Sequence, residues 1–169
     1  MSHNMWGELK PNSRSNFPED LIKEQFDLLT EMTAGSVIGR VEQLDRGIDD
    51  LTTSPLAGIA RIAQTMQQNI RIQDILGESG EDQAFTFEVY LTGKNTPGYK
   101  YRFMVLQHGI SPYPVRAVIE QAIADDFTAS NPETDGSYND EHEFQLFLSC
   151  ILGSQRVMNI VNGLLAYQS

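Results

Sequence analysis

Few side chains in this sequence are suited to catalysis, because its 169 residues include only three histidines and one cysteine. His108 ends a predicted strand, a position from which an imidazole can act as a general base or bind a metal ion. The spacing of the other polar residues identifies no partner for it, and a structural role explains it more simply. His3 lies near the amino terminus, where we expect no role. His108 is therefore the one candidate catalytic residue, and we expect no cofactor.

The stretch from Asp140 to Glu143 is a second candidate, for metal binding. Glu141, His142 and Glu143 offer the oxygen and imidazole ligands that metal ions prefer. Consecutive residues at a helix start point in different directions, so they need further ligands from elsewhere to converge on one ion. Carboxylates also stabilise the amino terminus of a helix. We therefore expect a helix start here rather than a metal site.

Cys150 falls within an apolar helical pattern, which predicts a buried small hydrophobe rather than a nucleophile. A single cysteine excludes an intramolecular disulfide and a cysteine-rich zinc site, and fits a reducing compartment. No P-loop, G-x-G-x-x-G, G-x-S-x-G or H-E-x-x-H pattern occurs. The amino terminus lacks the pattern of a signal peptide, and no stretch approaches the roughly 18 apolar residues of a membrane span. We expect a cytoplasmic protein.

The charge distribution is the clearest unusual feature of the sequence. The formal net charge is −11 and the isoelectric point is near 4.5, which argues against direct binding of nucleic acid or anionic membranes. From Glu120 to Glu143 there is no Lys or Arg. Such a run is usually a solvated face, but it can also attract a basic protein. The candidate partner-binding residues are Asp125, Asp126, Glu133, Asp135, Asp140 and Glu141.

The element that must position these residues is a β-hairpin over residues 85–92 and 99–108. Apolar residues alternate with polar ones in both strands, the period expected where one sheet face is buried. Placing both apolar rows on one face requires opposed residues whose numbers sum to an even value, for example Phe87 with Phe103. The second strand ends apolar on both faces, which predicts that it lies inside the sheet. The connection over residues 93–98 consists of turn residues.

The other elements follow from hydrophobic periodicity. Residues 1–17 read as a flexible arm and residues 18–169 as one domain. Pro18 begins a helix whose broad apolar face includes Leu28 and Met32, and Gly35 ends it. A strand follows over 36–44, with Gly39 marking a bulge or a close backbone approach. Further expectations are loops at 45–50, 77–83 and 127–139, a helix at 55–68, a strand at 70–76, and two closing helices separated by Gly153-Ser154.

Three stretches together resemble a group of small uncharacterised bacterial proteins. They are Pro18-x-x-Leu-Ile-Lys-Glu-Gln through Gly35, Tyr99-x-Tyr-Arg-Phe with His108-x-x-x-x-Tyr-Pro-Val115, and Glu143-Phe with the paired helices after it. The resemblance implies an amino-terminal helix, a sheet and two closing helices, with no assigned function. Periodicity alone favours a helix over 113–123, whereas the resemblance implies an extended segment. We therefore expect a strand at 113–118, followed by a short helix or turn.

Together these observations predict an α+β fold, with an antiparallel sheet of about four or five strands packed against an amino-terminal helix and two carboxy-terminal helices. The function expected first is a non-enzymatic bacterial protein-interaction module with an acidic surface. It would bind a protein partner, for which a basic protein is one candidate, or a second copy of itself. The alternatives are a small enzyme or ligand-binding domain that uses His108, and an acidic mimic of nucleic acid.

Overall fold

The computed structural model describes residues 10–11, 17–52, 84–127 and 132–167, and shows the predicted α+β architecture. Five strands form one antiparallel sheet in the order β1-β2-β3-β4-β5. The predicted helix at 55–68, the predicted strand at 70–76, the predicted loop at 77–83 and nearly all of the predicted arm at 1–17 lie outside the described residues. The elements in chain order are α1 Pro18–Met32, β1 Val37–Leu44, α2 Ile48–Thr52, β2 Phe85–Gly93, β3 Thr96–His108, β4 Val115–Ile119, α5 Gln121–Ala124, β5 Asp135–Tyr138, α6 Glu141–Leu152 and α7 Gln155–Ala166.

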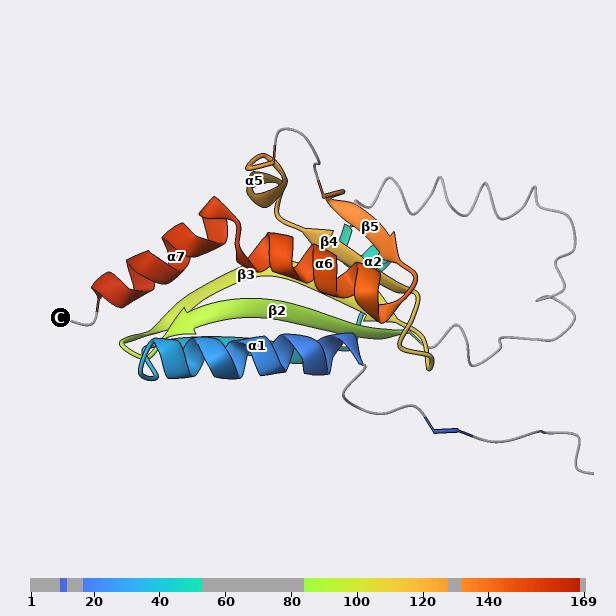
Figure 1. Ribbon diagram of the computed structural model, residues 1–169, viewed down its shortest axis with the longest axis horizontal. Helices are drawn as coiled ribbons and strands as arrows, with labels where there is room; N and C mark the ends of the chain where they lie inside the picture. The colour runs from blue at the N-terminus through green and yellow to red at the C-terminus, as the bar shows by residue number, and fades with distance from the viewer. Residues whose placement is uncertain (1–9, 12–16, 53–83, 128–131, 168–169) are drawn as a thin grey trace, which may run out of the picture.

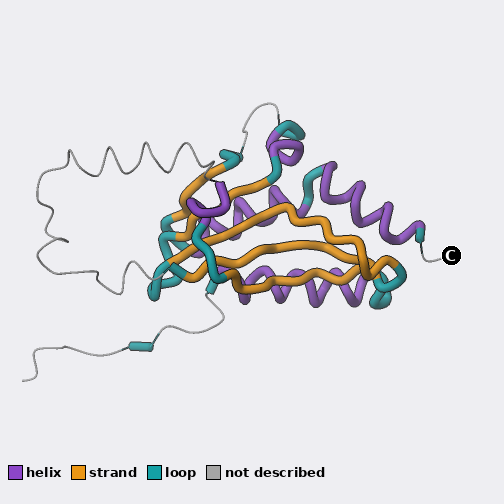
Figure 2. The backbone as a smooth tube through the Cα atoms, turned by 180° about the vertical axis from the view of Figure 1, so that it is seen from behind, coloured by secondary structure: helices purple, strands orange, loops and turns teal. Residues whose placement is uncertain are grey.

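The helices α1, α6 and α7 lie on one face of the sheet, with α6 and α7 end to end above α1 (Figure 1). Seen from behind, the strands lie in front of these helices (Figure 2). One hydrophobic cluster joins the two layers, and its fully buried members include Ile22, Val37, Phe103, Phe144 and Ile151. The core therefore lies between the sheet and the three long helices, as the sequence predicts.

The first helix, α1, packs closely against β1 because β1 has a glycine, Gly39, at the point of contact. Pro18 occupies the first turn, where its missing N–H costs no hydrogen bond. Gly35 follows the end of α1 and has a φ of +77°, a conformation that glycine adopts without strain. A Cβ at Gly39 would lie 2.1 Å from Cγ of Phe26, so only glycine fits beneath that ring. The predicted close approach at Gly39 is confirmed.

The hairpin forms as predicted. Its register agrees with the prediction near the turn, where Tyr90 pairs with Arg102 and Leu91 with Tyr101, but differs from it at the open end. Phe87 pairs with Leu106 and not with Phe103, and the register shifts between Val89 and Tyr90. Met104 pairs with Val89 while Arg102 pairs with Tyr90, so Phe103 is the extra residue of a β-bulge. The bulge lets both Phe103 and Met104 face the core. The turn is also tighter than expected, since β3 begins at Thr96.

The central position of β3 is confirmed, because it pairs with β2 on one side and with β4 on the other. The strand predicted at 113–118 is observed as β4, two residues later, and the short helix α5 follows it. The predictions of loops at 45–50 and 127–139 are wrong in part. The first contains the start of α2, and the second contains β5.

The closing helices begin with side-chain caps. Asp140 accepts a hydrogen bond from N of Glu143, and Ser154 accepts one from N of Val157. The predicted break at Gly153-Ser154 is confirmed. In the described part of the chain no single helix is long and apolar enough to cross a membrane, and α6 and α7 reach that length only together, across a bend of 53°.

Candidate functional site

The candidate catalytic residue His108 is buried and bonded through both ring nitrogens. Its Nε2 lies 2.9 Å from Oε2 of Glu19, in the first turn of α1, and its Nδ1 lies 2.7 Å from the carbonyl oxygen of Gly109. His108 and Glu19 are each only 4% exposed. The carboxylate partner that the sequence could not identify is therefore Glu19, which lies 89 positions away along the chain.

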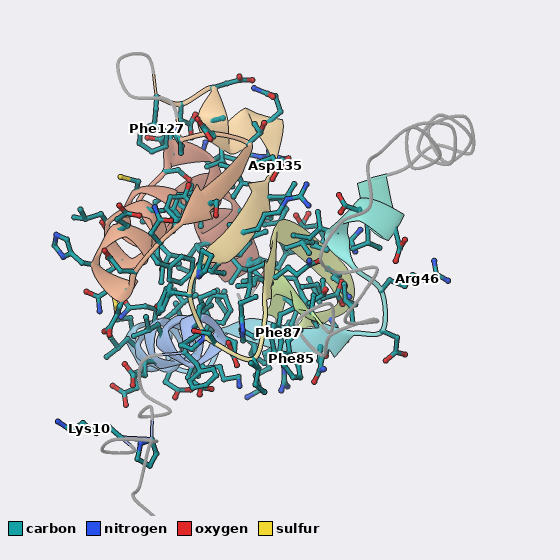
Figure 3. All side chains as sticks on the ribbon, turned by 90° about the vertical axis from the view of Figure 1, so that its right-hand side faces the viewer. Lys10, Arg46, Phe85, Phe87, Phe127 and Asp135 are labelled. Carbon is teal, nitrogen blue, oxygen red and sulfur yellow. The ribbon has the colours of Figure 1, made fainter. Side chains whose placement is uncertain are left out.

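Three aromatic rings surround this pair. Phe87 stacks on the imidazole with ring centroids 5.8 Å apart, and Phe85 and Phe17 lie 5.9 Å from it. Phe85 and Phe87 lie side by side at one end of the sheet, well apart from Asp135 (Figure 3). A cavity of about 410 Å³ borders the cluster and is also lined by Lys23, Gln43 and Ile110. The pair is thus enclosed mainly by apolar groups.

The hydrogen bonds fix the protonation of His108. The carbonyl of Gly109 can only accept, so Nδ1 carries a proton, and Nε2 donates to the carboxylate of Glu19. Burial alone would lower the pKa of His108, but the hydrogen bonds to Glu19 and Gly109 outweigh it and raise this pKa above its usual value. Neither nitrogen has a free lone pair in this arrangement. The geometry therefore makes an ion pair between α1 and β3, in which both ring nitrogens of His108 are engaged.

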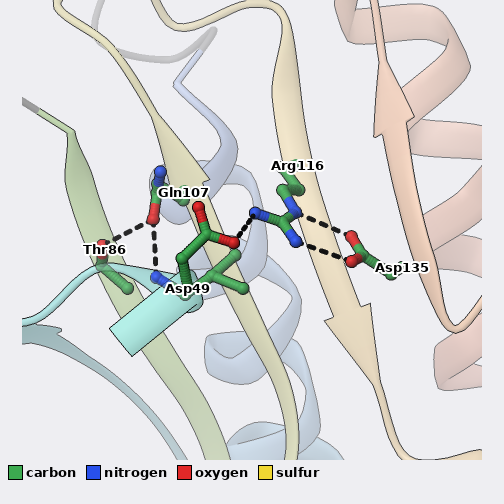
Figure 4. Close-up of polar contacts among 6 residues, drawn as sticks. Asp49, Thr86, Gln107, Arg116 and Asp135 are labelled. Carbon is green, nitrogen blue, oxygen red and sulfur yellow. Dashed lines mark hydrogen bonds and ion pairs between the residues drawn. The ribbon is translucent and has the colours of Figure 1, made fainter. Parts of the chain in front are cut away.

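The acidic run contributes mostly to internal contacts. Arg116 donates to Asp135 at 2.8 and 2.7 Å and to Asp49 at 3.0 Å, which joins β4, β5 and α2 (Figure 4). The two hydrogen bonds from Arg116 to Asp135 hold the pKa of Asp135 below its usual value. Gln107 accepts from Thr86 and from N of Ile48 beside them. This network fastens α2 to the face of the sheet away from the long helices.

The other candidate acids of the run are also used within the fold. Asp126 accepts from N of Arg156, Asp125 accepts from Gln121, and Asp140 caps α6. Glu133 is exposed beside β5. These carboxylates are exposed, even where they are bonded within the fold, and their attraction of a basic partner stays a prediction.

The metal candidates make separate contacts at the start of α6. Glu141 accepts from Gln145, Glu143 accepts from N of Asn139, and His142 is exposed. Among the described residues, no group of three or more His, Cys, Asp or Glu side chains could hold a metal ion. Cys150 is exposed, so the prediction of a buried hydrophobe is wrong. The inward face of α6 carries Phe144, Phe147, Leu148 and Ile151, and Cys150 lies to one side of it.

A groove runs between α1 and the helices α6 and α7, and we call it the helical groove. It joins a hollow of about 280 Å³ beside α6 to one of about 200 Å³ beside α7, and both are lined by Gln25 and Leu152. Leu28 and Met32 from α1 and Met158 from α7 line its α7 end. These three side chains are 51%, 84% and 43% exposed. The predicted apolar face of α1 is therefore only partly covered by the core.

A second groove, here the β5 groove, lies between β5 and α6. Its volume is about 540 Å³, and Gly136 and Tyr138 line it from β5. Leu146, Phe147 and Cys150 line it from α6. The sequence predicted neither groove. The helical groove forms between α1 and the distant helices α6 and α7, and the β5 groove depends on how β5 packs against α6, the next element in the chain.

Comparisons with protein-family models, with curated proteins and with solved structures found no match to this chain. The resemblance to small uncharacterised bacterial proteins stays a prediction.

Proposed function

We propose that this protein is a non-enzymatic interaction module that binds an amphipathic, basic helix of a partner protein in the helical groove. The observation that carries this proposal is the exposure of Leu28, Met32 and Met158 along one groove. Fully burying a side chain of this kind contributes about 1.5–3 kcal/mol, so covering three partly exposed ones is a substantial gain. A cytoplasmic location is part of the proposal and is supported by the single cysteine.

The shape of the groove favours a helix as the occupant. Its wall is α1, whose 15 residues extend about 22 Å at 1.5 Å per residue. Leu21, Leu28 and Met32 share one side of α1, at the spacing of successive turns. A partner helix laid along α1 would place its residues i, i+3, i+4 and i+7 against this stripe. Methionine side chains adapt to different apolar surfaces, which suits a binding groove.

The rim of the groove indicates the charge of the partner. At 100° per residue, Glu24, Asp27 and Glu31 follow the outer side of α1 next to the apolar stripe, and all three are exposed. On α7 the exposed positions Asn159 and Asn162 are uncharged. Lys or Arg on the flank of a partner helix that faces α1 would meet these carboxylates. Exposed pairs contribute little affinity, but they speed association in a way that salt screens.

The same charges disfavour a second copy as the occupant with two α1 helices in contact, since their carboxylates would repel. Contact between α1 of one copy and α7 of another is free of that repulsion, so self-association is an outcome that the experiment must separate from partner binding.

The test uses a fluorescent synthetic peptide of about 18 residues, long enough to span the groove, with Leu at helical spacing and Lys elsewhere. We expect fluorescence anisotropy to show that this peptide binds and that its binding weakens as salt is raised. A matched peptide with Glu in place of Lys should bind more weakly. The double variant Leu28→Asn, Met32→Asn should bind the Lys peptide at least about tenfold more weakly. Leu51→Asn is the matched control, because Leu51 is 41% exposed on α2, away from the groove.

Two outcomes would contradict this function. Equal affinity of the double variant and the Leu51→Asn control would mean that the peptide binds elsewhere. A dimer by analytical ultracentrifugation that the double variant abolishes, together with no peptide binding, would assign the groove to self-association.

A further inference from the structure

We infer that β5 is a strand-addition site, at which an extended, basic segment of a partner protein pairs with the sheet and fills the β5 groove. This site is separate from the helical groove, and neither proposal depends on the other. The first observation is topological: β5 ends the order of strands and pairs with β4 alone among the described strands. Its other edge is the place where a further strand can join the sheet.

The hydrogen-bond pattern shows which backbone groups face that edge. N of Ile119 donates to the carbonyl of Thr134 at 2.9 Å, and the same register pairs Ala117 with Gly136 and Val115 with Tyr138. In an antiparallel pair, hydrogen-bonded positions alternate with positions whose N–H and C=O point outward. Asp135 and Ser137 are the outward positions. An added strand would therefore form its ladder with these two residues.

The β5 groove provides room for the side chains of the added strand. A Cβ at Gly136 would lie 2.9 Å from the hydroxyl oxygen of Tyr138, so this glycine lets the Tyr138 ring lie across the strand. The Tyr138 ring stacks on Phe147 with centroids 4.2 Å apart, which makes an aromatic floor. Leu146 stands beside it, 57% exposed. Every second residue of an added strand would point into this hollow, whose apolar lining favours an aliphatic or aromatic side chain.

The charge of the β5 groove and the properties of the opposite sheet edge both favour β5 as the site. Glu133 and Glu143 line the groove, and no Lys or Arg does so among the described residues. Basic residues in the added segment would therefore be attracted. The opposite edge strand, β1, is a poorer site for a basic segment, because its exposed Arg40 would repel one. The proposed occupant is thus an extended segment with alternating apolar and basic residues.

The experiment uses the full chain and a synthetic peptide of about eight residues that alternates Val and Lys, with two N-methylated versions. Methylation of alternate backbone nitrogens removes the donors on one edge of the peptide and keeps every side chain. We expect the version whose methylated nitrogens face β5 to lose binding at least about tenfold. The version whose methylated nitrogens face away from β5 should keep its binding. Amide hydrogen exchange should show new protection at Asp135 and Ser137. Gly136 and Tyr138 should be protected already without the peptide.

A pair of variants places the site on β5. Ser137→Pro removes an outward N–H that the β4 ladder does not use, so the strand can keep its pairing while the added strand loses a donor. Ser137→Thr keeps that N–H and is the control. The Leu28→Asn, Met32→Asn variant should bind the extended peptide normally, which separates this site from the helical groove.

The inference is overturned if both methylated peptides bind as well as the parent, or if the parent peptide does not bind. It is also overturned if peptide binding leaves the exchange of Asp135 and Ser137 unchanged. Loss of binding in both Ser137 variants would assign the effect to the side chain and contradict strand addition.

Discussion

Nε2 of His108 donates a hydrogen bond to Oε2 of Glu19 across 2.9 Å, and this contact ties the last residue of β3 to the first turn of α1. Both side chains are almost fully buried. A buried ion pair contributes little net stability against an apolar replacement, but loss of one partner is costly because the other charge stays buried. The pair therefore fixes where α1 begins.

Replacement of Glu19 should destabilise the protein strongly. Glu19→Ala leaves the imidazolium without its counter-charge, and we expect a loss of about 3 kcal/mol in the free energy of unfolding. Glu19→Gln keeps an acceptor for Nε2–H and should cost less, about 2 kcal/mol. Chemical denaturation measures both. Glu24→Gln, on the exposed side of α1, should change the free energy by less than about 0.5 kcal/mol. A similar loss for Glu24→Gln would refute the special role of the buried pair.

The same pair predicts a pH dependence. The pKa of His108 is raised in the folded state, so its stabilising contribution is complete below the unfolded-state pKa of about 6.5 and is lost as pH rises through the folded pKa. The free energy of unfolding of the wild type should therefore fall relative to that of Glu19→Gln between neutral and alkaline pH, by about 1 kcal/mol for each unit of pKa shift. His142→Gln, at an exposed histidine, should leave the profile unchanged, and parallel profiles for wild type and Glu19→Gln would contradict the assignment.

The fold could be predicted from the sequence wherever a period was clear. The helical spacing in α6 and α7 corresponds to one buried face in each helix. In β2 the alternation predicts the strand, but Thr86 and Glu88 of its polar row are buried as well as Val89 and Leu91. The bulge at Phe103 could not be predicted, because Met104, Val105 and Leu106 are all apolar and either row suits the core. Cys150 could have been placed correctly, since a helical projection of α6 already puts it beside the Phe144–Ile151 face.

The candidate site was less predictable because its contacts are tertiary. His108 was identified, but Glu19 already had a sufficient local explanation as an acid at a helix start. The exposure of Leu28 and Met32 had one visible signal: the apolar face of α1 is broader than a single packing contact requires. The grooves themselves depend on the spacing of elements that no local pattern specifies.

The hydroxyl of Tyr113 is buried and makes no hydrogen bond within the described part of the chain. Burial raises the pKa of Tyr113 to about 12. Removal of an unsatisfied hydroxyl relieves its desolvation cost, so Tyr113→Phe should stabilise the protein by about 1 kcal/mol. Tyr101→Phe is the contrasting variant, because the Tyr101 hydroxyl donates to Glu120 and its loss should destabilise by about 1 kcal/mol. A lower thermal unfolding temperature for Tyr113→Phe, as expected for Tyr101→Phe, would show that the Tyr113 hydroxyl does have a partner.

The contact between Gly39 and Phe26 sets the distance between α1 and β1, and a double-mutant cycle can measure it. A Cβ at position 39 would overlap the Phe26 ring, at 2.1 Å from Cγ, so Gly39→Ala should cost about 3 kcal/mol. Phe26→Leu should cost about 1–2 kcal/mol, since Leu leaves part of the ring volume empty. If the clash is the cause, the double variant should be more stable than the sum of the two losses predicts, by at least about 1 kcal/mol. Gly98→Ala controls for substitution of a strand glycine, because a Cβ there meets no atom within 4 Å. Additive losses in the cycle would show that the Phe26 ring is not what excludes a Cβ at position 39.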